Sequence, residues 1–346
     1  MPKLPIRPTL CKKSISGPLV IALIIAITAN EARAHHVAVG GPTSTAGPIN
    51  APSADTLRKG EITVALRAQT ENYDEFSNEA LEGFAAAGLE GVHNTDAAYI
   101  ASLALEYGVT DDLSIGVVAP YVLRYGVREG EIEDGVPEAH VLGDARGFGD
   151  LVVTARYRFL ERAQHGVSLS LLASLKAPTG ESDERTNSGG SFETEFQPGS
   201  GSWDPSVGLA AGAKVGPFFV DASGGYTFVT DGDRDTNLGD RASYNLGLSY
   251  RIGKGAHTHD DGEFERHQAL DLVLELNGEW GERERIGAEI DPHSGGSQLF
   301  ISPGLRYVSK HGWTSFVSVG LPIYEDLNGV QNETDFRATV GVGASF

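Results

Sequence analysis

Cysteine is nearly absent from this sequence. Cys11 is the single cysteine in 346 residues, which excludes an internal disulfide and a cysteine-based metal site. Basic residues are scarce too, with 27 Lys and Arg against 47 Asp and Glu. The net charge of −20 argues against a nucleic-acid partner, because such partners are held by clustered Lys and Arg. No apolar run reaches the roughly 20 residues that a membrane-spanning helix needs.

Residues 1–34 have the features of a secretory signal peptide. Lys12 and Lys13 end a basic start, and an apolar run extends from Leu19 to Ala29. Small residues then precede a predicted cleavage point after Ala34. Cleavage would leave an exported chain without apolar helices, and such a chain crosses a membrane only with strands.

Residues 35–60 are rich in Gly, Pro, Ser and Thr and show no periodicity. We expect an irregular periplasmic leader here, or a plug that folds into the interior of the domain that follows.

From residue 61 to residue 346 the chain repeats one pattern, about ten residues of alternating apolar and polar character followed by a turn. In the last segment Phe336, Val340 and Val342 share one face, whereas Arg337 and Thr339 share the other. The apolar spacing of three and four that a helix requires is missing. The pattern predicts an all-β transmembrane antiparallel barrel of about 12 strands, near 61–70, 97–107, 112–125, 148–160, 166–177, 203–214, 216–230, 240–252, 268–280, 297–309, 313–323 and 334–346.

The connections alternate between short and long, which is typical of a bacterial outer-membrane barrel with its long loops outside the cell. The long connections are 71–96, 126–147, 178–200, 231–239, 281–296 and 324–333. When Asp240 is counted with the fourth of them, they carry 29 acidic and 6 basic residues together. These carboxylates are either a solvated surface or a surface for divalent cations that bridge lipopolysaccharide or gather at a channel mouth.

Aromatic residues gather at both ends of the segments, as they do at the two interfaces of a bilayer. If the apolar faces contact lipid, the opposite faces line a lumen. By this alternation the lumen-lining charged residues are Arg67, Glu106, Arg124, Arg156, Arg158, Lys176, Lys214, Asp221, Arg251, Asp271, Glu275, Glu279, Arg306 and Arg337. A 12-stranded barrel predicts a narrow conduit, and the alternative is a structural barrel closed by its own ion pairs.

Histidines concentrate in the one long periplasmic connection, and imidazole with carboxylate can hold Zn, Cu or Ni. The candidate ligands are His257, His259, Asp260, Asp261 and His267, and the alternative is a solvated polar link. All histidines fall in loops rather than on strand faces, so we expect no enzyme and no cofactor.

Several short motifs resemble the outer-membrane transporter family called putative MetA-pathway of phenol degradation. They are Gly-Phe-Gly-Asp-Leu at 147–151, Ala-Arg-Tyr-Arg-Phe at 155–159, Leu-Lys-Ala-Pro-Thr-Gly at 175–180, Ser-Pro-Gly-Leu-Arg-Tyr at 302–307 and Gly-Leu-Pro-Ile at 320–323. The resemblance implies an outer-membrane barrel associated with the passage of aromatic or other small apolar compounds, with no catalytic residues.

Together these features predict a channel in the bacterial outer membrane that passes small organic compounds passively. Its partners would be membrane lipid, lipopolysaccharide and small-molecule cargo. The alternatives are a structural barrel, a barrel that binds ligands through its loops, and an outer-membrane protein linked to a periplasmic metal.

Overall fold

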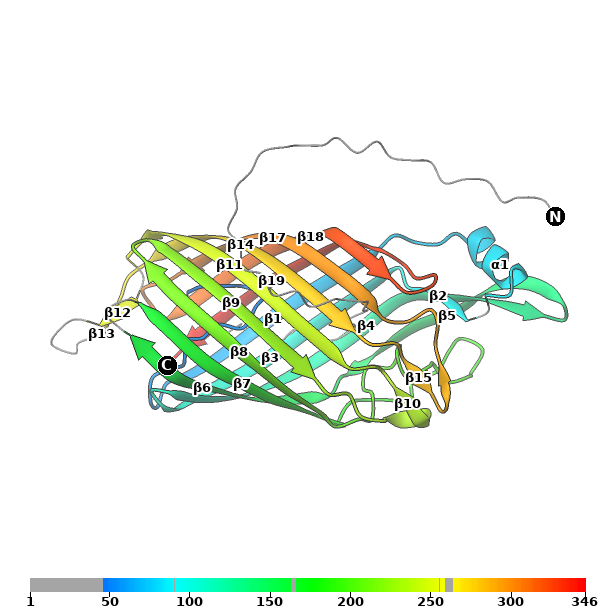
Figure 1. The fold of residues 1–346 in the computed structure, drawn as a ribbon, viewed down its shortest axis with the longest axis horizontal. Helices are drawn as coiled ribbons and strands as arrows, with labels where there is room; N and C mark the ends of the chain where they lie inside the picture. Colours follow the sequence, from blue (N-terminus) through cyan, green and yellow to red (C-terminus); the bar gives the residue numbers. More distant parts are fainter. Residues whose placement is uncertain (1–45, 90, 163–165, 255, 259–263) are drawn as a thin grey trace, which may run out of the picture.

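The computed structural model describes residues 46–346 except 90, 163–165, 255 and 259–263. Twelve strands form one closed antiparallel barrel (Figure 1), as the sequence predicted. The strands are β1 (Ile62–Tyr73), β3 (Ala97–Thr110), β4 (Leu113–Glu133), β6 (Leu151–Arg162), β7 (Val167–Ala177), β8 (Asp204–Val215), β9 (Phe218–Thr227), β11 (Arg241–Gly253), β14 (Ala269–Gly281), β17 (Gly296–Val308), β18 (Trp313–Leu327) and β19 (Thr334–Ser345). Each of these strands pairs with the next one along the chain, and the last strand, β19, pairs with the first, β1, where Thr63 lies opposite Ser345.

Exposure follows the two-residue period of the strands, with the apolar side chains outside. In β1, Val64 and Leu66 are 36% and 57% exposed, whereas Thr63 and Arg67 are 1% and 5% exposed. A soluble protein shows the reverse arrangement, because water then covers the polar face. An apolar outer surface around a polar interior is the arrangement that lipid contact requires.

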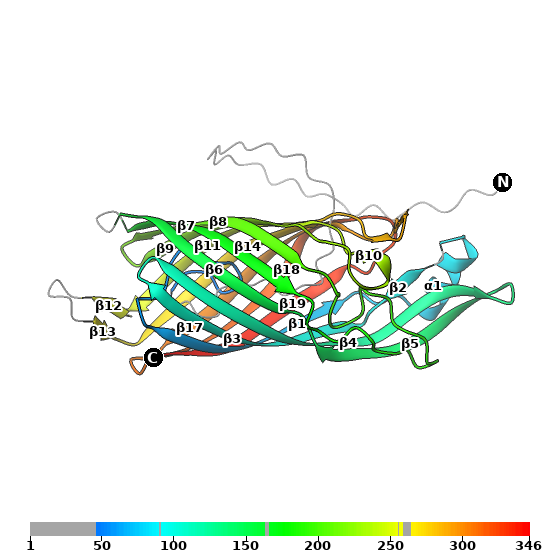
Figure 2. The same cartoon turned by 90° about the horizontal axis from the view of Figure 1, so that it is seen from below.

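The connections between strands divide between two rims of the barrel (Figures 1 and 2). One rim, which we call the short-turn rim, has tight links and the small hairpin of β12 (Ala256–Thr258) and β13 (Phe264–Arg266). The other, the long-loop rim, carries the six long connections. Its additional elements are α1 (Asn78–Ala86), β2 (Val92–Asn94), β5 (Val136–Phe148), η2 (Asp233–Asp235), β10 (Thr236–Asn237), β15 (Arg285–Ile286) and β16 (Glu289–Ile290).

The segment 126–147, which we expected to be a loop, is mostly a β-hairpin that extends beyond the barrel. Strand β4 continues to Glu133 and pairs with β5 down to the contact of Glu133 with Val136. The turn residues Asp134 and Gly135 both have positive φ, at 51° and 81°. Asp-Gly is a strong signal for a two-residue hairpin turn, so the signal for this hairpin is present in the sequence.

Helix α1 packs on this hairpin at the long-loop rim. Its N-cap is Ser77, whose hydroxyl accepts a hydrogen bond from the backbone N–H of Ala80. Leu81 is fully buried, and a Cβ at Gly130 of β4 would lie 2.4 Å from the Leu81 carbonyl oxygen. Glycine at position 130 therefore allows the close contact of helix and strand. In the described part of the chain, no helix is long and apolar enough to cross a membrane.

Candidate functional site in the barrel lumen

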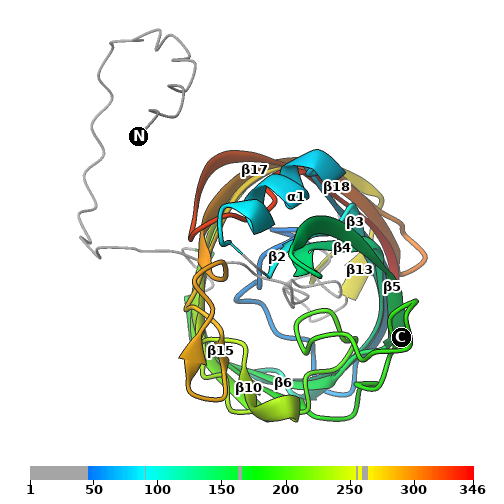
Figure 3. The same ribbon diagram turned by 90° about the vertical axis from the view of Figure 1, so that its right-hand side faces the viewer.

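Residues 46–60, which we call the inner segment, run inside the barrel (Figure 3). The carboxylate of Glu275, from β14, holds the first part of this segment. It accepts hydrogen bonds from the backbone N–H of Ile49 at 2.8 Å and of Asn50 at 3.0 Å, and from the Asn50 side chain at 2.8 Å. Glu275 is fully buried, so these three donors replace the water that its charge would otherwise need.

Two arginines hold the carbonyl groups of the same stretch. Arg306, from β17, donates to the carbonyl oxygens of Gly47 at 2.7 Å and Pro48 at 2.6 Å. Arg67, from β1, donates to the carbonyl of Ile49 at 3.0 Å. Gly47 has φ +77°, and a Cβ there would lie 3.0 Å from a carboxylate oxygen of Asp221. This turn of the inner segment therefore requires glycine.

The later part of the inner segment bonds to strands on the opposite wall. Arg156 donates to the carbonyl of Asp55 at 2.6 Å, and the backbone N–H of Leu57 donates to the hydroxyl of Ser114 at 2.8 Å. The hydroxyl of Ser168 donates to the Asp55 carboxylate at 3.2 Å. The inner segment is thus bonded to several walls of the lumen, mainly through polar contacts.

The structure places the fourteen charged residues assigned to the lumen in three groups. Arg158 and Lys214 lie near the short-turn rim, where Arg158 pairs with Asp112 at 3.0 Å and Lys214 is exposed over the ring of Phe219. Partly exposed side chains inside the barrel are those of Arg156, Glu279 and Arg337. The buried ones are Arg67, Glu106, Arg124, Lys176, Asp221, Arg251, Asp271, Glu275 and Arg306.

Many of these charges are paired across neighbouring strands. Arg251 makes two 2.7 Å hydrogen bonds to the carboxylate of Asp271. Arg337 bonds to Glu279 at 2.6 Å and to Glu71 at 2.9 Å. Such bidentate and bridging pairs are the form in which buried charge is tolerated, and they keep the inward side chains in fixed positions.

A cavity of about 290 Å³ lies beside the inner segment. Asn50 and Pro52 of the inner segment form part of its wall. Its charged lining includes Arg67, Glu106, Arg156, Lys176, Arg241, Glu279 and Arg337, and its apolar lining includes Val152, Leu172 and Phe300. The ring of Phe300 lies 4.0 Å from the guanidinium of Arg337. The cavity therefore offers both cationic groups and apolar surface to a ligand.

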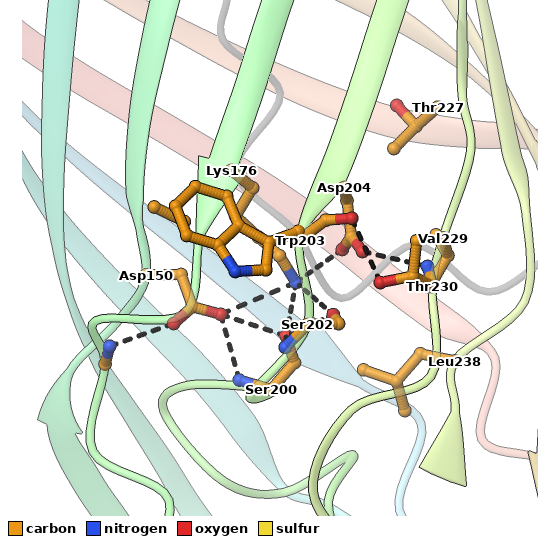
Figure 4. Close-up of polar contacts among 12 residues, drawn as sticks. Asp150, Lys176, Ser200, Ser202, Trp203, Asp204, Thr227, Val229, Thr230 and Leu238 are labelled. Carbon is orange, nitrogen blue, oxygen red and sulfur yellow. Dashed lines mark hydrogen bonds and ion pairs between the residues drawn. The ribbon is translucent and has the colours of Figure 1, made fainter.

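At the long-loop rim, Lys176 of β7 is the centre of a buried polar network (Figure 4). Its ammonium group lies 2.5 Å from the carboxylate of Asp204 and 3.4 Å from that of Asp150, and it donates to the hydroxyls of Ser200 and Ser202. The network joins the ends of three strands to residues 178–203, which we call the β7–β8 loop.

Asp150 also holds the backbone of this loop. Its carboxylate accepts from the N–H groups of Thr179 at 3.1 Å, Gly180 at 2.9 Å and Ser200 at 2.9 Å. A Cβ on Gly180 would lie 2.7–2.8 Å from the backbone of Gly149 and Asp150. The Gly-Phe-Gly-Asp-Leu and Pro-Thr-Gly motifs are therefore two halves of one loop anchor.

Sequence reasoning assigned Lys176 to the lumen but did not find its partners. The two motifs were the available signal, since they place an acidic residue and closely packed glycines at adjacent strand ends. Asp204, which begins β8, carries no comparable local signal.

For the predicted periplasmic metal site, the structure gives only part of the ligand set. His257 is in β12, opposite Glu265 of β13, and His267 follows that hairpin. His259, Asp260 and Asp261 lie outside the described residues. The metal hypothesis at this link stays a prediction.

Comparisons with known proteins agree with the fold. The sequence profile of the family described as "Putative MetA-pathway of phenol degradation" matches residues 121–326. The COG4313 outer membrane channel from Pseudomonas putida F1 is similar over 86% of this chain and 100% of its own, with a TM-score of 0.62 and 16% identity. The CymD monoaromatic hydrocarbon channel is similar over 84% of this chain and 89% of its own, with a TM-score of 0.41 and 10% identity.

LpxR from Salmonella typhimurium is similar over 82% of this chain and 99% of its own, with a TM-score of 0.42 and 10% identity. No curated protein matches the sequence. At 16% identity, the likeness to the Pseudomonas putida channel establishes the fold, which is that of outer-membrane barrels and agrees with the predicted location.

Proposed function

This chain belongs to the "Putative MetA-pathway of phenol degradation" family, and on that premise we propose that it is an outer-membrane channel for passive diffusion of small organic compounds. The observation that carries the proposal is the 290 Å³ cavity inside a closed barrel, next to an inner segment held mainly by hydrogen bonds. A barrel whose interior is filled entirely by side chains has no such space.

The inner segment is the gate in this proposal. Its apolar anchoring in the lumen includes Ile49, which packs with Val273 and Phe316. Many of its other contacts are hydrogen bonds to Glu275, Arg306 and further polar groups, and water can replace such bonds when the segment shifts. A segment held in this way can leave its site when water enters the lumen and replaces these bonds, whereas a segment with a large apolar core gains no such replacement.

The lining of the cavity indicates the class of cargo. The cationic group of Arg241 favours an anionic or strongly polar group on the solute, whereas Phe300 and Leu172 favour an apolar part. We therefore propose small organic compounds that combine both features, with aromatic acids as the first candidates.

The surface outside the membrane suggests a second partner. Acidic side chains such as Glu131, Glu133 and Glu138 are exposed, or partly so, on the β4–β5 hairpin at the long-loop rim. We propose that the acidic residues of this rim meet lipopolysaccharide through divalent cations. Extraction with a chelator should then release bound lipopolysaccharide from the purified protein.

The channel proposal is tested by flux into proteoliposomes. Benzoate, which crosses lipid slowly as an anion, is compared with a trisaccharide that is too large for the cavity. The variant that lacks residues 46–56 should pass benzoate faster than the full chain, since the inner segment is removed. If neither the full chain nor the shortened variant passes benzoate while both are folded barrels, the channel proposal is wrong. Saturable ligand binding without flux would then favour a barrel that binds ligands through its loops.

A further inference from the structure

An imidazole and three carboxylates meet outside the barrel, at the long-loop rim. The imidazole is that of His93 in β2, which pairs directly with Glu129 of β4. Glu193 and Glu195 come from the β7–β8 loop, about 100 residues further along the chain. This cluster takes no part in the lumen contacts described above.

Two of the carboxylates approach Nε2 of the ring and one approaches Nδ1. Nε2 of His93 lies 3.2 Å from Glu129, within hydrogen-bond range. Nδ1 lies 3.5 Å from Glu195, and Nε2 lies 3.8 Å from Glu193. One ligand atom from each of His93, Glu193 and Glu195 can be chosen so that all lie within 4.8 Å of one another.

The 3.5 Å between Nδ1 of His93 and Glu195 suits one metal ion, and the half-exposed Glu193 is close enough to turn toward it. Tetrahedral zinc, with bonds of about 2.0–2.2 Å, places its ligand atoms roughly 3.3–3.6 Å apart, so small side-chain shifts would complete the site. A histidine that binds a metal usually donates its other ring N–H to a carboxylate, which fixes the ring and its tautomer. Glu129 stands in that position, with Nε2 as donor and Nδ1 left for the metal.

The cluster is held in place by packing on both sides. The ring of Phe196 meets the His93 ring edge-on at 4.9 Å. Phe192 and Phe196 are buried against Val127 and Ala145, so the two glutamates that lie between them in sequence are presented to the histidine. A rigid surrounding shell of this kind is what a preformed metal site requires.

Exposure and charge also favour a bound cation. The His93 side chain is 11% exposed and that of Glu195 is 12% exposed, whereas Glu193 is 49% exposed and leaves one side open to solvent. Three carboxylates, those of Glu129, Glu193 and Glu195, surround this one imidazole, and a divalent cation would offset their negative charge.

We propose that His93, Glu193 and Glu195 bind a divalent transition-metal ion of the Zn²⁺ class, with Glu129 orienting the imidazole. The imidazole selects against Ca²⁺ and Mg²⁺, which take oxygen ligands. The bound ion joins β2 to the β7–β8 loop, and it therefore fixes that loop to the long-loop rim of the barrel. The site is independent of the channel proposal.

The experiment is Zn²⁺ titration of the detergent-purified full-length barrel by calorimetry, with folding checked by the heat-dependent shift on gels. His93→Ala should lose one equivalent of bound zinc, and Glu129→Gln should weaken binding by about 10–100-fold. The matched control is His140→Ala, which removes the histidine of a second cluster with Glu133 and Glu138 at the hairpin and should keep that equivalent.

If His93→Ala does not fold, Glu193→Gln carries the test, since this side chain is half-exposed and its loss should weaken binding at least tenfold. The inference is overturned if the folded His93→Ala variant, or Glu193→Gln in its place, binds zinc as the parent does. It is also overturned if His140→Ala alone removes the equivalent.

Discussion

Glu275→Gln should open the lumen, because this carboxylate holds the inner segment by its charge. Three donors from Ile49 and Asn50 bond to it at 2.8–3.0 Å. A hydrogen bond to a charged group contributes roughly 1.5–3 kcal/mol and a neutral one roughly 0.5–1.5 kcal/mol, so the substitution costs about 1 kcal/mol for each bond. The total of about 3 kcal/mol corresponds to a rise of about 100-fold in the ratio of released to bound inner segment.

Single-channel recording in planar bilayers measures this ratio as the open-to-closed ratio. The matched control is Glu71→Gln, which makes the same change of charge in the lumen. Glu71 bonds to Arg337 and Thr334, and no hydrogen bond joins it to the described inner segment. The reasoning is refuted if folded Glu275→Gln opens no more often than the parent, or if Glu71→Gln opens equally often.

Three further outcomes are expected at the long-loop rim. Lys176→Met leaves the buried Asp150 carboxylate without its cation, which should cost about 3–5 kcal/mol locally and speed hydrogen exchange in the β7–β8 loop. Gly180→Ala brings a Cβ to 2.7 Å from neighbouring backbone, and it should loosen the same loop by roughly 1–3 kcal/mol without unfolding the barrel on gels. Zinc should slow trypsin cleavage after the exposed Arg185, and unchanged cleavage would contradict a metal link to this loop.

The strands could be predicted closely because lipid and lumen impose opposite demands on successive residues. The segment predicted at 97–107 is β3, which spans Ala97–Thr110. The segment predicted at 268–280 is β14, which spans Ala269–Gly281. A shift of one residue would turn Leu66 into the lumen and Arg67 into lipid, so the alternation determines which face each side chain occupies.

The long connections were predicted less well, because their structure depends on contacts that local patterns do not show. Asp134–Gly135 marks the hairpin and Ser77 begins α1, so both elements had local signals. The cluster of His93, Glu193 and Glu195 had none, since β2 and the β7–β8 loop are about 100 residues apart in sequence and only the tertiary structure brings them together.

The inner segment shows the same limit inside the lumen, and it bears on function. Its irregular composition predicted a leader or plug, but its partners Glu275 and Arg306 lie more than 220 residues away in sequence. Because those partners bond to backbone N–H and carbonyl groups, the contacts depend on the path of the inner segment more than on its side chains. Individual side chains matter at three positions: Asn50 bonds to Glu275, Ile49 packs with Val273 and Phe316, and Gly47 has a positive φ with the Asp221 carboxylate 3.0 Å from where a Cβ would lie. In the proposed gate, loss of the charge of Glu275 or Arg306 is therefore expected to release the inner segment, because several bonds to its backbone weaken at once.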